Sequence, residues 1–168
     1  MTTQAGGASF KMQNILQQAL LARRNLSVED RASASEFICR KVTESKIFSS
    51  AKFVGCYLPM RDEVDTKSLC HVVVIGREVD TKLIIERGWC ANKRIFVPIM
   101  RNNGKMFFRE IRPDSTLLRN DMSIWEPPSG EIIPPRALQL VVTPTVAFDG
   151  NNHRIGMGGG YYDRYFSF

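Results

Sequence analysis

The residues best suited to chemistry lie near the C-terminus, in the stretch AFDGNNHRIGMGGGYYDR at 147–164. It holds four glycines between Gly156 and Gly160, preceded by Arg154 and followed by Asp163. Because glycine lacks a Cβ atom, backbone amides in such a turn can approach an anion closely. A guanidinium adds charge-assisted hydrogen bonds to phosphate, and carboxylates are ligands that Mg²⁺ prefers. The stretch predicts a phosphate site, although a tight turn that only closes a strand against a helix would have the same composition.

The glycine spacing matches neither common phosphate fingerprint. A Walker loop ends in Gly-Lys-Ser/Thr, which is absent, and a dinucleotide fingerprint lies early in a strand-helix unit with an acid downstream. Neither His71 nor His153 has another metal-ligating residue at the spacing that a metal site requires. Four cysteines are spaced too widely for a zinc site, and we expect reduced, mostly buried thiols; they are Cys39, Cys56, Cys70 and Cys90.

Composition indicates one globular domain. The chain has 168 residues, of which 43% are hydrophobic and 24% charged, as in ordinary soluble proteins. A net charge of +6 favours anionic small molecules, but the basic residues are scattered, so we expect no nucleic-acid partner. No apolar run is long enough for a membrane span. We expect a cytosolic monomer; a mitochondrial address is the alternative, because the first 24 residues contain no acid.

The elements that must position the glycine stretch follow from apolar periodicity. After a loose tail at 1–9, the pattern predicts helices at about 10–25 and 28–47, the second capped by Ser27. Short apolar runs predict buried strands, and a helical stretch separates the first two of them. The strands are expected at 52–58, 94–99 and 138–149, with an excursion or edge strand at 104–111 and an irregular connection at 125–138. The class is α/β with a mainly parallel sheet.

One short motif occurs twice. EVDTK stands at 63–67 and again at 78–82, separated by SLCHVVVIGR. A period seen once is no repeat architecture, so we interpret 68–82 as an insertion or local duplication. Removing one copy would leave a simple strand, helix, strand series.

The whole string TPTVAFDGNNHRIGMGGGYYDRY resembles the C-terminal signature of the 5-formyltetrahydrofolate cyclo-ligase (5,10-methenyltetrahydrofolate synthetase) family, with Ile155 in place of a leucine. YLPMRDEVDT at 57–66, KRIFVP and WEPP resemble further family segments, so the resemblance covers about 10–168. It implies a three-layer α/β/α fold of the sugar-phosphate-isomerase and CoA-transferase type. It also implies a ligase of one-carbon metabolism, which closes 5-formyltetrahydrofolate, with or without a polyglutamate tail, to 5,10-methenyltetrahydrofolate and converts ATP to ADP and phosphate.

The resemblance also implies roles for individual residues. Mg²⁺ would be bound by Asp163, and the reacting groups would be stabilised by Arg154, Met157 and Gly158. The ATP site would comprise Lys11, Arg154, Ile155, Gly156, Met157, Gly158, Gly159, Gly160, Tyr161 and Tyr162. The folate site would comprise Leu58, Met60, Glu63, Trp125 and the residues from Met157 to Tyr161, with Glu63 accepting hydrogen bonds from the pterin N–H edge.

The sequence departs from the family pattern in three places. The first helix of the family carries Lys and, four residues later, Arg; here Lys11 is followed by Ile15, or Met12 by Leu16. The duplication leaves two candidates for the folate carboxylate, and we favour Glu63 over Glu78 because it follows the expected strand directly. Family members also continue beyond YYDRY with a helix and a strand. A non-catalytic nucleotide- or folate-binding relative, or a ligase of the same fold with another substrate, therefore stays open.

Overall fold

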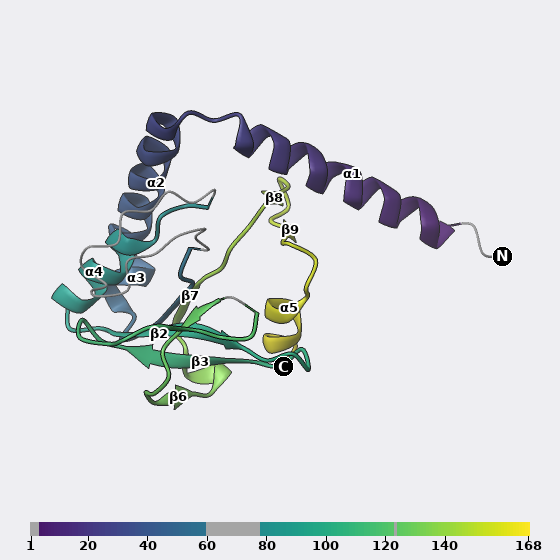
Figure 1. Cartoon of the computed structure of the whole chain (residues 1–168). Helices are drawn as coiled ribbons and strands as arrows, with labels where there is room; N and C mark the ends of the chain where they lie inside the picture. The colour runs from purple at the N-terminus through teal and green to yellow at the C-terminus, as the bar shows by residue number, and fades with distance from the viewer. Residues whose placement is uncertain (1–3, 60–77, 123) are drawn as a thin grey trace.

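Short apolar runs form a central sheet, as their residue types predict. The computed structural model describes residues 4–59, 78–122 and 124–168, with side chains from Met12 onward. Its five-stranded sheet has the order β6-β3-β2-β1-β7 (Figure 1). The strands are β1 Phe53–Cys56, β2 Arg94–Met100, β3 Met106–Ile111, β6 Ile132–Ile133 and β7 Leu140–Val142. β1 pairs in parallel with β2 and β7, whereas β3 pairs antiparallel with β2 and β6, so the sheet is mixed.

Four helices precede β2 in the described part of the chain. They are α1 Gln4–Arg24, α2 Val28–Thr43, α3 Lys46–Ser50 and α4 Lys82–Cys90. Ser27 caps α2 as expected, because its hydroxyl accepts a hydrogen bond from the amide of Asp30 at 2.9 Å. The single helix expected at 28–47 is wrong, since α2 ends at Thr43 and Ser45 caps α3 in the same way. α1 also begins earlier than expected and includes most of the segment assigned to a tail.

Alternating side chains build two apolar layers, one on each face of the sheet. Val54 and Ile95 join a buried cluster with α2, α3 and α4. On the opposite face, Phe96 and Phe108 pack with Tyr162, which lies on helix α5 Tyr161–Tyr165. The one-turn helix η2 Pro135–Ala137 also packs on this second cluster. Helices therefore cover both faces, which confirms the expected α/β class.

The C-terminal strands are shorter than their apolar sequence suggests. The strand expected at 138–149 is wrong as a single element, because it divides into β7 and β8 Ala147–Phe148 around Pro144. Proline has no N–H group to donate to a strand ladder. β8 pairs with β9 Arg154–Ile155 in a small hairpin. The irregular connection contains two brief strands, β5 Trp125–Glu126 and β6, and β5 pairs with β4 Leu118–Arg119.

The segment expected as an excursion or edge strand is internal to the sheet, because β3 has a partner on each side.

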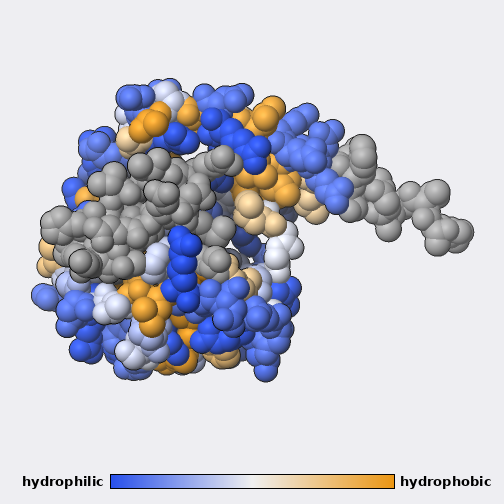
Figure 2. All heavy atoms as spheres, in the orientation of Figure 1, coloured by the Kyte–Doolittle hydropathy of each residue, from blue (hydrophilic) through white to orange (hydrophobic). Residues whose placement is uncertain are grey.

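α1 extends away from the rest of the chain in Figure 1. Apolar side chains gather over the C-terminal half of α1 in Figure 2, and Met12, Ile15 and Leu21 are exposed. Among the described helices, none combines the length and apolar character that a membrane span requires.

Candidate functional site

The parallel strands place the candidate site at one edge of the sheet. β1, β2 and β7 run in the same direction, so their carboxyl ends meet at this edge. Tyr57 follows β1, Arg101 follows β2, and Pro144 lies two residues beyond β7. In open α/β sheets, the crevice outside these ends is the usual ligand position. The residues that cross this edge are therefore the candidates for binding and chemistry.

The predicted glycine turn has the backbone that glycine alone adopts easily. It runs from β9 to α5, and both Gly158 (φ +89°) and Gly160 (φ +63°) lie in the left-handed region. Apart from Gly158 and its two chain neighbours, no heavy atom of the described residues lies within 4 Å of the point where a Cβ on Gly158 would stand, so the turn is open there. Because α5 has only five residues, the amides of the turn matter more for anion binding than a helix dipole.

Hydrogen bonds tie this turn to the end of β2. The hydroxyl of Tyr161 donates to the carbonyl of Arg101 at 3.2 Å. Arg164 donates from Nη2 to the carbonyl of Gly159 at 2.8 Å and from Nε to that of Gly104 at 3.4 Å. Beside them, the ring of Tyr162 packs edge-on against Phe108, with 6.4 Å between ring centroids. The turn is therefore held over the sheet edge.

Arg154 lies across the glycine turn and is paired with Asp163. Its Nη2 is 2.6 Å from Oδ1 of Asp163, and its Nη1 donates to the carbonyl of Pro144 at 3.2 Å. The same Nη1 is 2.8 Å from the position that a Cβ on Gly156 would take, so a side chain at 156 would displace the guanidinium from its present position. The Arg154 side chain is 23% exposed, whereas that of Asp163 is 72% exposed. A positive charge is thus fixed over the turn while a carboxylate beside it stays open to solvent.

The hydroxyls of two tyrosines, Tyr57 and Tyr162, are the next polar groups of the site. The hydroxyl of Tyr57 donates to the carbonyl of Val79 at 3.1 Å. Burial raises the pKa of this hydroxyl, and the nearby carboxylate of Glu78 raises it further. Burial likewise raises the pKa of Tyr162, to which Cys56 and Glu78 also contribute. The Tyr162 hydroxyl is buried and makes no hydrogen bond to any described residue.

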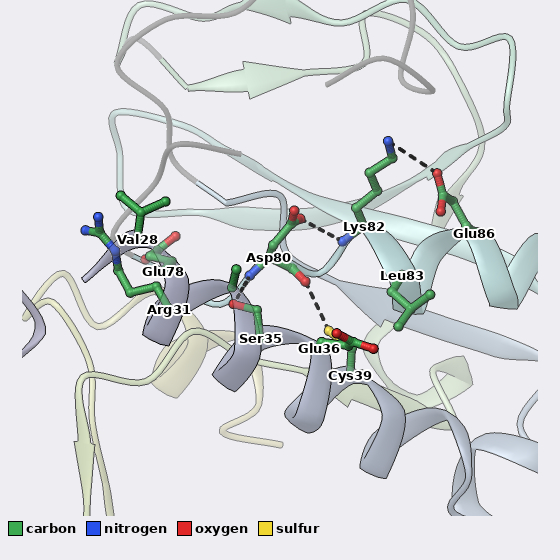
Figure 3. A pocket seen from close by; sticks show the side chains of 11 residues that line it. Val28, Arg31, Ser35, Glu36, Cys39, Glu78, Asp80, Lys82, Leu83 and Glu86 are labelled. Carbon is green, nitrogen blue, oxygen red and sulfur yellow. Dashed lines mark hydrogen bonds and ion pairs between the residues drawn. The ribbon is translucent and has the colours of Figure 1, made fainter. Parts of the chain in front are cut away.

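A cavity of about 340 Å³ lies between α2 and α4 and reaches Glu78 (Figure 3). Its polar lining comes from α2 and from the second EVDTK copy; it includes Arg31, Ser35, Cys39, Glu78, Asp80 and Lys82. Burial, followed by the charge of Asp80, raises the pKa of the Cys39 thiol to about 11, so this thiol stays protonated at neutral pH and is a poor nucleophile. Cys39, Cys56 and Cys90 are free thiols, and the first two are buried as expected.

The Trp125 loop is attached to the end of β2 by a buried carboxylate. Glu126 is 6% exposed; it accepts hydrogen bonds from the amide of Met100, from Arg101 Nη1 at 3.1 Å and from Asn120 Nδ2 at 2.8 Å. The sequence analysis missed Glu126 and Arg101. The available signal was an acidic residue between an aromatic side chain and two prolines, in WEPP.

The structure brings some of the predicted site residues together. Arg154, Asp163 and the turn from Gly156 to Tyr162 form one connected unit, and Tyr161 joins it to the Trp125 loop through Met122. The indole N–H of Trp125 is buried without a described partner, and Arg119 stacks on its ring. Leu58 packs against the apolar cluster on the α2 and α4 face. The side chain of Lys11, and all of Met60 and Glu63, lie outside the described residues.

Among the described residues, no three His, Cys, Asp or Glu side chains come together as a metal site. Mg²⁺ commonly uses one or two carboxylates and completes its shell with water and substrate phosphate. Asp163 fits that pattern, because it is exposed and has one carboxylate oxygen outside its pair with Arg154.

The fold and this edge define a class: an α/β protein with a glycine turn and a fixed guanidinium over the carboxyl ends of its parallel strands. The sequence pattern of the 5-formyltetrahydrofolate cyclo-ligase family matches residues 70–168, more than half of the chain. The chain therefore belongs to this family, which confirms the resemblance that its C-terminal signature carries.

Individual relatives agree with this assignment. The chain is 40% identical over 104 residues to the 5-formyltetrahydrofolate cyclo-ligase of Escherichia coli and covers 57% of that protein. It is 29% identical over 150 residues to the mouse 5-formyltetrahydrofolate cyclo-ligase and covers 66% of it. The solved 5,10-methenyltetrahydrofolate synthetase of Aquifex aeolicus superposes with a TM-score of 0.73 at 25% identity, over 93% of this chain and 72% of that one. The chain thus spans somewhat more than half the length of the curated bacterial relative.

Proposed function

We propose that this protein converts 5-formyltetrahydrofolate to 5,10-methenyltetrahydrofolate and uses ATP, with release of ADP and phosphate. The family assignment supports this reaction, and one structural observation carries it for this chain. The guanidinium of Arg154 is held across an open glycine turn at the carboxyl ends of the parallel strands. A fixed positive charge beside free backbone amides suits a triphosphate, whose terminal group gains charge as it is transferred.

The reaction divides into two steps. In the first, the formyl oxygen attacks the γ-phosphorus of ATP, the bond to the β-phosphate oxygen breaks, and ADP leaves. In the second, N10 of the folate attacks the formyl carbon and loses its proton, and the bond between the formyl carbon and its oxygen breaks, so that this oxygen leaves in the released phosphate. Both steps place negative charge on phosphoryl oxygens. Arg154 and the amides around Gly158 would stabilise that charge without reorganising, because they are already in position.

The substrate would meet the remaining predicted residues around the same turn. Met157 is 62% exposed on the turn, where its side chain would pack on the folate. Tyr161 and Trp125 would supply flat walls for the pterin ring, and Leu58 and Met60 an apolar one. When Mg²⁺ is bound, it neutralises phosphate charge. Asp163 would hold it with the carboxylate oxygen that does not contact Arg154.

The test is the appearance of 5,10-methenyltetrahydrofolate, followed by its absorbance, in purified protein with 5-formyltetrahydrofolate, ATP and Mg²⁺. We expect product only when ATP is present. Arg154→Met should lower the rate about 10²- to 10³-fold, which is typical for loss of one group that stabilises the transition state. Arg87→Met, on the exposed surface of α4, is the matched control and should keep the wild-type rate. Folded protein that forms no product would overturn the proposal, and binding of folate or ATP without turnover would identify a non-catalytic relative.

The proposal includes the expected cytosolic, monomeric state. Sedimentation of the purified chain as a monomer would support the expected oligomeric state. A stable dimer would contradict that part of the proposal alone.

A further inference from the structure

The duplicated motif leaves two glutamates that are followed by the same four residues, Val-Asp-Thr-Lys. Glu63 and Glu78 each begin an EVDTK segment, 15 positions apart. Only the second copy, at 78–82, lies within the described residues. Its contacts show which parts of the fold it joins.

The second copy is bonded to the residue that follows β1. Thr81 is fully buried, and its Oγ1 donates to the carbonyl of Tyr57 at 2.8 Å. The Tyr57 hydroxyl donates in turn to the carbonyl of Val79 at 3.1 Å. These two bonds join the same short segment to the backbone and to the side chain of one residue. The second copy therefore lies against the carboxyl end of β1, although 24 positions separate Thr81 from Tyr57.

The same segment is also fixed to α2. The amide of Asp80 donates to Ser35 Oγ at 3.1 Å, and the thiol of Cys39 donates to the carbonyl of Asp80 at 3.0 Å (Figure 3). The Asp80 carboxylate accepts from the amide of Lys82, the first residue of α4, at 3.0 Å. Glu78 thus precedes a segment whose backbone is held by β1 and α2 and leads directly into α4.

The charge of Glu78 acts on the side of the site formed by α5. Its carboxylate raises the pKa of the hydroxyls of both Tyr57 and Tyr162, and its segment is bonded to Tyr57 through Val79 and Thr81. The Tyr162 hydroxyl is buried without a described partner, directly after the glycine turn, and its ring lies 5.8 Å from the Arg154 guanidinium carbon. The charge of Glu78 therefore acts on a buried hydroxyl next to the glycine turn.

We propose that Glu78, rather than Glu63, is the carboxylate that binds the N–H groups of the substrate, and that the second EVDTK copy is the one built into the site. This inference rests on the proposed function, since a pterin offers adjacent N–H donors that a carboxylate can accept together. The preference for Glu63 in the sequence analysis is thereby reversed.

The experiment compares Glu78→Gln with Glu63→Gln, a matched pair of substitutions at the first residue of the two EVDTK copies. Equilibrium dialysis with 5-formyltetrahydrofolate, without ATP, measures binding apart from chemistry. We expect binding about 10- to 100-fold weaker in Glu78→Gln, as for the loss of charged hydrogen bonds, and within about twofold of wild type in Glu63→Gln. Weaker binding in Glu63→Gln, equal effects in the two variants, or no effect in either would overturn the inference.

A second pair of variants separates this inference from the proposed function. Thr81→Val removes a buried donor to the Tyr57 carbonyl, and Thr66→Val is the same change in the first copy. We expect the midpoint of thermal unfolding to fall by roughly 2–10 °C in Thr81→Val and to stay unchanged in Thr66→Val. If wild-type protein bound no folate, the proposed function would fail. This second pair would still decide which copy is built into the fold, and the reverse order of midpoints would refute our assignment.

Discussion

Replacing Asp163 with asparagine separates its role in ligand binding from its role in folding. The change keeps the shape of the side chain and removes its charge. In the structure this charge lies 2.6 Å from the Arg154 guanidinium, on a side chain that is 72% exposed. Exposed ion pairs stabilise proteins by about 1 kcal/mol or less. Arg154 also keeps its hydrogen bond to the Pro144 carbonyl and its position over the Tyr162 ring.

The expected loss of folding stability is therefore below about 1 kcal/mol, a shift of the thermal midpoint below roughly 4 °C for a chain of this size. The effect on function should be much larger. The neutral amide in Asp163→Asn would neither orient Arg154 by charge nor offer an anionic oxygen to Mg²⁺, so we expect the rate to fall about 10²- to 10³-fold.

Two measurements on the same preparation test this reasoning. Initial rates of product formation report activity, and thermal unfolding with and without MgATP reports stability and ligand binding. Asp163→Asn should lose most of the rise in midpoint that MgATP gives the wild type, whereas Asp114→Asn, an exposed carboxylate in the turn after β3, should keep it. A midpoint lowered by about 10 °C or more without ligand would show that Asp163 is structural. Wild-type rate and MgATP response in Asp163→Asn would show that the pair has no function.

Two further predictions concern the frame of the site. The hydrogen bonds from Arg94 hold the pKa of Glu110 below its usual value, so this contribution to stability is complete above the ordinary carboxyl pKa and is lost as pH falls through the lower, folded value. Glu110→Gln should therefore destabilise the protein more at about pH 7 than at about pH 3 in urea unfolding; an equal loss at both would contradict this. Glu126→Gln should cost about 1–3 kcal/mol in unfolding free energy at neutral pH, because the Met100 amide and Arg101 lose the charged acceptor that the buried Glu126 provides. An unchanged urea midpoint would refute it.

Local sequence was informative where one residue type has one physical role. The glycine-rich stretch predicts a turn, and Gly158 and Gly160 adopt positive φ within it. The apolar runs at β1 and β2 predict buried strands, and both are central in the sheet. Ser27 predicts a helix start that its hydroxyl caps. These features depend on backbone geometry and burial, which neighbouring residues largely determine.

Longer elements were less predictable because a single residue can interrupt them. Pro144 divides an apolar run that reads as one strand, and Ser45 divides a helical pattern by offering a new cap. The ion pair between Arg154 and Asp163 also could not be predicted from the sequence. It joins residues nine positions apart across a glycine turn, and no helical or strand periodicity predicts that separation.

The choice between the two EVDTK copies shows a different kind of limit. Removing residues 63–77 or removing residues 68–82 yields the same shorter sequence, because the five residues that remain are identical in both cases. No deletion can therefore show which copy the fold uses, and local propensity is equal for the two. What differs is the neighbour: the second copy leads into α4 and is bonded to Tyr57 and α2 through tertiary contacts. Point substitutions act on one copy at a time, so the matched glutamate and threonine pairs can distinguish what sequence and deletion cannot.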